Sequence, residues 1–555
     1  MRRAFLPSVL KTAALILAAI GCTGDEAESG GGTVIISSAA DADALLPPLR
    51  TSVGGRMMSE LLFDPLVEVG PELNTFGDAG FASRLAKSWS WSADSLVITF
   101  ALDPSAHWED GHAVVGRDVR AGFAAIREPA NGSTTLSDVT EIDSVHVVDE
   151  HTVSMHFRAR SAEQMYTASL VFPLPAHLVD TIPAGALSTS AFAQHPVGSG
   201  RYRLVSREPT VRIELAAVAG HYRGRPGPDR VALVVSKEPS TAIAKLWTEE
   251  ADVFDVLPPP DVAEAAMHPH VQLVRTLGFD YTFVGFNFRD PRDTSRAHPV
   301  LADVRLRRAI AQSIDGTSIV RALFDTLARP GAGPFVRAQA AGDTTLVHPA
   351  FDATAANAAL DALGWTKRGR DGTRMRAGQC LVLRALVPAP SANRVRAAVL
   401  VQEQLRGVGI DMHVEKVDGQ AFGAARDAGA WDLIFGGWGT TPSIRGIRGT
   451  WGGRAHKGWG RLNSGNYAST AFDAALEAGF SSLDTATARG HFRDAFRTIT
   501  DDVPAIWLYE VMPVSAVNAR FTLPRWRPEA WWRTIADWRL DPSRAMPRDA
   551  RPKAK

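Results

Sequence analysis

The sequence predicts a mixed α/β protein of more than one domain, with a separate α+β part toward its N-terminal end. At 555 residues the chain is too long for a single hydrophobic core. Residues 96–157 contain short strand-like runs separated by turns, which is typical of antiparallel pairing. Residues 393–438 alternate helical and strand patterns, which favours parallel strands connected through helices.

The α+β part is predicted from strand-like runs around one helix. Residues 96–102 are apolar and β-branched, and Asp110-Gly111 behind them is a turn signal. Residues 118–127 carry apolar side chains at helical spacing, and residues 142–157 have the alternation of a hairpin. We therefore expect an antiparallel sheet with a helix packed against it.

The α/β part contains two helix–strand units. The predicted elements are a helix over 393–406, a strand over 410–414, a helix over 420–428 and a strand over 431–435. The first helix has an apolar face made of Val395, Ala398, Val399, Val401 and Leu405. Ligands of open α/β sheets collect beyond the carboxyl ends of the strands. The loop 436–442, with Trp438 among its glycines, is therefore either a ligand loop or a plain turn with a packed indole.

Residues 1–21 have the features of a lipoprotein signal peptide. A basic start with Arg2 and Arg3 precedes a short apolar run, and Cys22 follows small residues. The run is too short to cross a bilayer, which needs about 20 residues. Acylation of Cys22 would anchor the protein, and the polar residues 22–32 would form a flexible tether. A soluble signal peptide with an incidental cysteine and a twin-arginine signal are the alternatives.

Composition excludes several classes of protein. Basic and acidic residues both number 60, and the resulting absence of net charge argues against a nucleic-acid partner. Once Cys22 is lipidated only Cys380 remains, so no intrachain disulfide can form. The sequence has no His-Glu-x-x-His, Cys-x-x-Cys or G-x-S-x-G motif. We therefore expect no metal site, no cofactor and no catalytic residues.

Short motifs spread along the chain are similar, in order and spacing, to those of one known family. They lie at residues 61–67, 85–89, 107–119, 195–202, 303–315, 405–410, 431–438 and 502–506. The segment with Asp110-Gly111, for example, resembles a "kFhDG…DV" motif, and residues 195–202 resemble "PvGTGpY". The chain resembles the extracytoplasmic solute-binding proteins of ABC importers, in the peptide/nickel group (family 5), across nearly all of its mature sequence.

This resemblance implies a two-lobed, periplasmic-binding-protein-like fold of the large, three-subdomain type. Lobe I would comprise residues 33–280 and 505–540 and include an inserted subdomain over about 58–190. Lobe II would comprise residues 281–504, and a C-terminal tail would follow over 541–555. The hinge is expected near residues 285–287 and 503–506, because such hinges are a few residues that absorb dihedral change.

The resemblance also implies the ligand site. The expected ligand-binding residues are Trp438, Gly439, Thr440, Thr441, Arg445, Phe286 and Asn287. Peptide-binding relatives carry an aspartate in the loop after the tryptophan, where it pairs with the free amine of the peptide. Residues 439–443 contain no carboxylate, so a free peptide amine is doubtful as the anchor. Arg445 and Arg448 would either contact an anionic or hydroxyl-rich ligand or be solvated loop charges.

We therefore expect a lipid-anchored receptor, not an enzyme, that captures a small ligand between its lobes and delivers it to an ABC permease. An oligopeptide is the default ligand of the family. The protein is expected to be a monomer on the periplasmic or outer face of the cell membrane. The alternative is a non-transport sensor or scaffold on the same fold, which signals ligand occupancy to a partner. An extracytoplasmic hydrolase is a third hypothesis, separable by a test for turnover of bound ligand.

Overall fold

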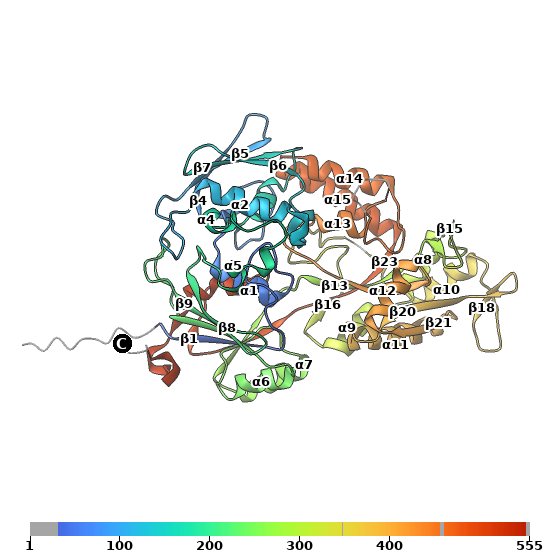
Figure 1. Ribbon diagram of the computed structural model, residues 1–555. Coiled ribbons are helices and arrows are strands. Elements are labelled where there is room, and N and C mark those ends of the chain that lie inside the picture. The colour runs from blue at the N-terminus through green and yellow to red at the C-terminus, as the bar shows by residue number, and fades with distance from the viewer. Residues whose placement is uncertain (1–30, 347, 455–459, 551–555) are drawn as a thin grey trace, which may run out of the picture.

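The computed structural model describes residues 31–346, 348–454 and 460–550, which form two lobes on two separate sheets (Figure 1). The predicted two-lobed α/β fold is confirmed. Each lobe has its own hydrophobic core, and a third core joins them. In that third core the rings of Phe76 and Phe492, which come from opposite lobes, stack with their centroids 5.2 Å apart.

The first lobe is built on a seven-stranded sheet. Its strands, in spatial order, are β12 (Val271–Arg275), β24 (Val514–Asn518), β11 (Val253–Phe254), β1 (Thr33–Ser38), β10 (Arg230–Val235), β9 (Arg212–Ala217) and β8 (Tyr202–Glu208). The central strand β1 is parallel to β10 and β11, while β24 returns antiparallel from the far end of the chain. Helices α6 (Pro239–Trp247) and α7 (Pro259–Glu264) belong to this lobe.

The predicted α+β part is a four-stranded antiparallel sheet with helices beside it. Its strands, in order, are β4 (Ala86–Trp91), β5 (Val97–Leu102), β7 (Thr152–Phe157) and β6 (Ile142–Val147). Helix α2 (Gly116–Arg127) packs against this sheet and against α4 (Ala176–Val179), and the short helices α3 (Gln164–Ser169) and α5 (Ala191–Gln194) lie in the same part of the chain. Helix α1 (Val53–Leu62) contacts β8 of the seven-stranded sheet. Alternate residues of β5, such as Ile98 and Phe100, are buried, which is the pattern of a sheet covered on one face.

The second lobe is built on a six-stranded mixed sheet. Its strands, in order, are β16 (Ala328–Arg329), β23 (Ala505–Val511), β13 (Asp280–Phe286), β22 (Leu433–Gly439), β20 (Val382–Pro388) and β21 (Asp411–Val417). Its helices are α8 (Val304–Gln312), α9 (Gly316–Phe324), α10 (Ala353–Ala362), α11 (Ala392–Gly407), α12 (Gly419–Ala428), α13 (Gly446–Thr450), α14 (Thr470–Ser481) and α15 (Thr485–Asp502). The predicted parallel pairing is present, because β20 runs parallel to β21 and β22. Val399 is an exception on α11, since it is 54% exposed and does not belong to the apolar face.

Short ribbons complete the fold. They are β2 (Val67–Val69) with β3 (Phe81–Ser83), β14 (Arg289–Asp290) with β15 (Asp293–Ala297), β17 (Lys367–Arg368) with β18 (Arg374–Arg376) and β19 (Gln379–Cys380), and β25 (Phe521–Thr522) with β26 (Arg539–Leu540). Among the described residues, no helix combines the length and the apolar character that a membrane span requires.

The structure shifts the expected boundary between the lobes. The sequence predicts that residues 505–540 return to lobe I, but β23 pairs with β13 and β16 and so belongs to the second sheet. Residues 285–287 and 503–506 are also not at a crossing, because Gly285 pairs with Ala505 inside that sheet. The chain instead crosses between the sheets in two places, from β12 to β13 and from β23 to β24.

The two crossings touch each other. The Thr276 backbone N–H donates to the Pro513 carbonyl at 3.1 Å. Gly278 lies so close to the second crossing that an added Cβ would stand 2.3 Å from the Val511 carbonyl oxygen. A side chain cannot be accommodated at that distance from backbone, so glycine keeps the two segments together.

We predict that Gly278→Ala destabilises the protein by about 1–3 kcal/mol, because the crossings must separate to admit the methyl group. Gly316→Ala is the matched control, since a Cβ there would meet no atom within 4 Å. Chemical denaturation of both variants measures the difference. Equal stability of the two variants would contradict a tight contact at the crossing.

Candidate functional site

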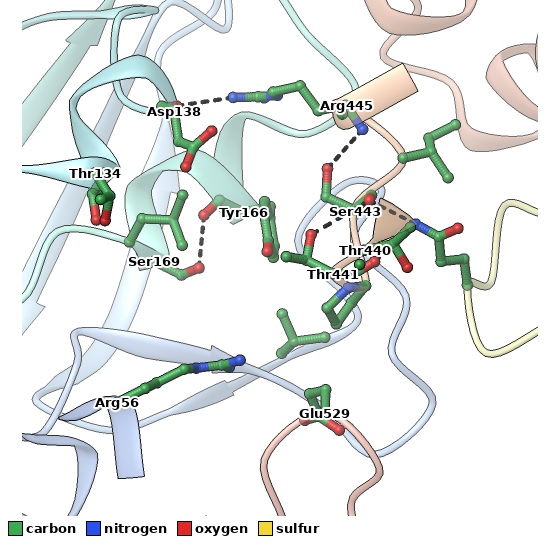
Figure 2. A pocket seen from close by; sticks show the side chains of 18 of the residues that line it. Arg56, Thr134, Asp138, Tyr166, Ser169, Thr440, Thr441, Ser443, Arg445 and Glu529 are labelled. Carbon is green, nitrogen blue, oxygen red and sulfur yellow. Dashed lines mark hydrogen bonds between the residues drawn. The ribbon is translucent and has the colours of Figure 1, made fainter. Parts of the chain in front are cut away.

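A cavity of about 410 Å³ lies where the two lobes face each other (Figure 2). One wall comes from the first lobe, through residues 50–60, 134–138 and 166–172. The other wall comes from the second lobe, through residues 438–450. This volume falls within the range of small-molecule binding pockets.

Five of the residues predicted to bind ligand line this cavity. They are Trp438, Gly439, Thr440, Thr441 and Arg445. Trp438 and Gly439 are not in a loop, because β22 continues to Gly439 through pairing with β13. Trp438 is half-buried and packs against the third core. The chain then turns at Thr440, whose backbone N–H and side-chain hydroxyl both donate to the Phe279 carbonyl, at 2.7 and 2.8 Å.

Phe286 and Asn287 lie apart from this cavity. On β13, Trp438 pairs opposite Tyr281, whereas Phe286 pairs opposite Leu433, five residues further along the strand. Phe286 is 1% exposed and borders a hollow of about 20 Å³, which Trp438 also reaches. The Asn287 side chain is buried and donates to the carbonyls of Gly429 and Trp431 at 3.0 and 2.9 Å. Both residues therefore support the sheet.

A buried carboxylate joins the lobes beside the cavity. Glu163 belongs to the first lobe and is fully buried. It accepts hydrogen bonds from the hydroxyl of Thr75, in its own lobe, at 2.5 Å and from Ser443, in the second lobe, at 2.6 Å. Burial raises the pKa of Glu163, and the nearby Arg445 and these hydroxyls counter that shift only in part. Opening of the lobes would remove the Ser443 bond and return the carboxyl to water.

Arg445 and Arg448 make ion pairs across the lobes. Each has a terminal nitrogen 3.2 Å from a carboxylate oxygen of Glu141, in the first lobe. Arg448 also stacks over the Phe480 ring, 3.9 Å from its centroid. The two arginines are therefore not solvated loop charges. The sequence could not indicate these pairs, because Glu141 lies about three hundred residues earlier in the chain.

A second group of charges forms the first-lobe floor of the cavity. The Glu60 carboxylate has Arg50 at 3.3 Å, Arg56 at 3.0 Å and Arg533 at 2.8 Å, and it accepts from the Trp532 indole at 2.8 Å. Burial alone would raise the pKa of Glu60, but the three arginines hold it well below its usual range. Three guanidinium groups surround this one carboxylate, and the carboxylates of Glu68 and Glu529, which also line the cavity, act on Arg533 as well.

Asp138 supplies the opposite charge at the other end of the cavity. Asp138 lines the cavity from the first lobe, and the Arg445 guanidinium donates to the Asp138 backbone carbonyl at 3.1 Å (Figure 2). In the described part of the chain no hydrogen bond reaches its carboxylate. Partial desolvation raises the pKa of Asp138, although the residue is exposed, and the charge of Arg445 offsets this only in part. The sequence did not indicate Asp138, because no motif marks the turn that carries it.

Two lobes on separate sheets, two adjacent crossings and a charged cavity between the lobes define a binding protein that encloses its ligand. The model of the bacterial extracellular solute-binding proteins, family 5, matches residues 80–446. The chain belongs to this family of solute-binding proteins and is extracytoplasmic in type.

Similar curated proteins extend over most of the chain. The oligopeptide-binding protein AppA of Bacillus subtilis is 22% identical over 95% of this chain and 97% of its own length. A candidate ABC transporter peptide-binding protein of Brucella abortus is 27% identical over 70% of each chain. The di/tripeptide-binding protein 2 of Pseudomonas aeruginosa is 23% identical over 65% of this chain and 68% of its own.

Solved structures support the fold. The substrate-binding protein CtaP of Listeria monocytogenes superposes with a TM-score of 0.78 at 19% identity, covering 92% of this chain and 99% of that one. AppA of Bacillus subtilis, solved with a nonapeptide, superposes with a TM-score of 0.71 at 20% identity and the same coverage.

We predict that Trp438→Ala weakens ligand binding by about 2 kcal/mol, because an indole on a cavity wall offers a large and rigid contact. Trp431→Ala is the matched control, since Trp431 is fully buried in the third core. That change should cost about 3–5 kcal/mol of folding stability. Calorimetric titration and thermal unfolding of both variants separate the two roles. An unchanged affinity of Trp438→Ala for the ligand would contradict a contact between the indole and the ligand.

Proposed function

We propose that this solute-binding protein is a lipid-anchored receptor that encloses a short peptide between its lobes and delivers it to an ABC permease. The observation that carries the proposal is the carboxylate of Asp138 at one end of the cavity and the arginines around Glu60 at the other. A peptide with free termini carries the complementary pair of charges, an ammonium group and a carboxylate.

The negative end would hold the ammonium group. Among the described residues none donates a hydrogen bond to the exposed Asp138 carboxylate, and a ligand ammonium would supply one. Charged hydrogen bonds of this kind are shorter and stronger than neutral ones. Peptide-binding relatives carry the amine-binding aspartate in the segment that corresponds to residues 439–443, which has none here. Asp138 would take over that role from the opposite lobe, so a ligand with a free amine could still be bound.

The positive end would hold the carboxylate. Arg56 has a side chain that is 34% exposed, and Glu60 is shared among Arg56, Arg50 and Arg533. The partly exposed Arg56 guanidinium is therefore the group at this end that an additional anion could reach. Guanidinium groups suit a carboxylate because their planar fork can donate two parallel hydrogen bonds.

The similar proteins support the same ligand class and the same transport role. Their names describe oligopeptide, di/tripeptide and ABC transporter peptide binding. The cavity volume of about 410 Å³ suits a short ligand better than a long peptide. We therefore propose that the ligand is a peptide of few residues and that the partner is an ABC permease.

We predict that Asp138→Asn lowers the affinity for a peptide with a free amine by at least about tenfold, because a charged hydrogen bond contributes about 1.5–3 kcal/mol. The probe is a peptide released from the purified protein and identified by mass spectrometry. Calorimetric titration measures its binding.

Two controls make this test specific. Asp143→Asn changes an exposed aspartate that pairs with Arg158 at 2.9 Å, and it should leave affinity unchanged. The N-acetylated form of the same peptide should bind wild type and Asp138→Asn equally. Equal binding of the free-amine peptide by both proteins would contradict the assignment of Asp138.

The proposed lipid anchor concerns Cys22, which lies outside the described residues. We predict that Cys22→Ser moves the protein from the membrane pellet to the soluble fraction after cell fractionation. Cys380→Ser is the matched control, because Cys380 is exposed on β19 and should not affect sedimentation. Sedimentation of Cys22→Ser with the membranes, as for wild type, would contradict the anchor.

A further inference from the structure

Three ligating side chains meet on the surface of the inserted subdomain, outside the cavity. Asp110 and His112 come from one turn, and His177 comes from α4. The Asp110 carboxylate has one oxygen 3.2 Å from His112 Nδ1 and the other 2.7 Å from His177 Nε2. One ligand atom from each residue lies within 4.8 Å of the other two. Two imidazoles and a carboxylate therefore meet in one place, although His177 is distant in sequence from the other two residues.

One buried carboxylate fixes the segments that carry these side chains. Asp118 Oδ2 accepts from the Trp108 indole and from the Val115 backbone N–H, both at 2.9 Å, at the two ends of the turn. Asp118 Oδ1 accepts from the Ala176 backbone N–H at 2.8 Å, directly before His177. The backbone positions of the three ligands are thus set relative to one another by Asp118. Prearranged ligands of this kind favour tight metal binding.

The turn itself is also constrained. The Trp108 backbone N–H donates to the His112 carbonyl at 2.8 Å, and the His112 backbone N–H donates to the Asp110 carboxylate at 3.2 Å. Gly111 adopts φ of +91°, a left-handed conformation that glycine reaches without strain. The sequence "DG" predicts this turn, but nothing in it indicates that His177 lies opposite.

The chemistry of the three groups selects the class of ion. Imidazole nitrogen and carboxylate oxygen are common ligands of Zn²⁺, and imidazole also suits Ni²⁺ and Cu²⁺. In the described part of the chain no lysine or arginine pairs with Asp110, so its charge is available to a cation. The side chains of Asp110, His177 and His112 are 28%, 29% and 63% exposed, so an ion can enter from solvent and keep water as a further ligand.

We propose that Asp110, His112 and His177 bind one divalent transition-metal ion, for which Zn²⁺ is the probe. This site is separate from the ligand cavity and does not depend on the proposed peptide ligand. It departs from our expectation of no metal site, which was based on local motifs. The ion would join the turn to α4 and hold the two segments together.

The test uses the full mature chain without a histidine tag, freed of metal with a chelator and titrated with Zn²⁺ against a chromogenic competitor. Wild type should bind one equivalent. His112→Ala and His177→Ala should each lower the affinity at least about tenfold, because loss even of groups behind the ligands costs 10–100-fold. Without metal, both variants should melt within about 2 °C of wild type, since the changed side chains are at the surface.

His413→Ala is the matched control. His413 is exposed and lies 2.8 Å from Asp411, so it forms the same kind of pair without a third ligating group. It should bind Zn²⁺ as wild type does. The proposal is overturned if wild type binds no stoichiometric Zn²⁺, if His112→Ala and His177→Ala bind as wild type does, or if His413→Ala loses as much affinity as they do.

Discussion

The hydrogen-bonded contact between the two chain crossings is the constraint on which the rest of the structure depends. β13 and β23 lie side by side in the second sheet, and the segments that lead from them to the first lobe are joined by the Thr276–Pro513 bond. We expect two connections held together at one line to permit rotation of the lobes and to resist their separation. The cavity lies between the lobes that this line connects, so we expect its walls to approach or part as rigid bodies.

Closure brings charges together that would otherwise be solvated. Glu163 is fully buried against Ser443, and Glu141 pairs with both Arg445 and Arg448. Burying such groups is costly unless each finds a partner, so these contacts alone favour closure only weakly. A ligand that neutralises Asp138 at one end and the arginines around Glu60 at the other would add the missing stabilisation. A ligand shifts the equilibrium between open and closed lobes only to the extent that it binds one of these states more tightly. Contacts at both ends of the cavity would make a ligand bind the closed state more tightly.

Local patterns in the sequence predicted much of the fold. The hairpin of β6 and β7, helices α2 and α11 and the strands β21 and β22 each have a sequence pattern that depends on near neighbours. The assignment of β23 to a lobe did not follow, because an apolar strand does not reveal which sheet it joins.

The residues around the site likewise include some that the sequence could predict and some that it could not. Trp438, Gly439, Thr440, Thr441 and Arg445 line the cavity and could be named in advance, because they lie at the end of a recognisable strand or shortly after it and match the ligand loop of a known family. Phe286 and Asn287 do not, since the direction and register of β13 place them at the other end of the sheet. Asp138 and the arginines around Glu60 escaped prediction because their roles arise only where distant segments meet. The most direct test of the account is small-angle X-ray scattering of the ligand-free protein and of the same protein saturated with the peptide identified from it. The account predicts a smaller radius of gyration with peptide bound, whereas an unchanged radius at full saturation would contradict closure about the crossing.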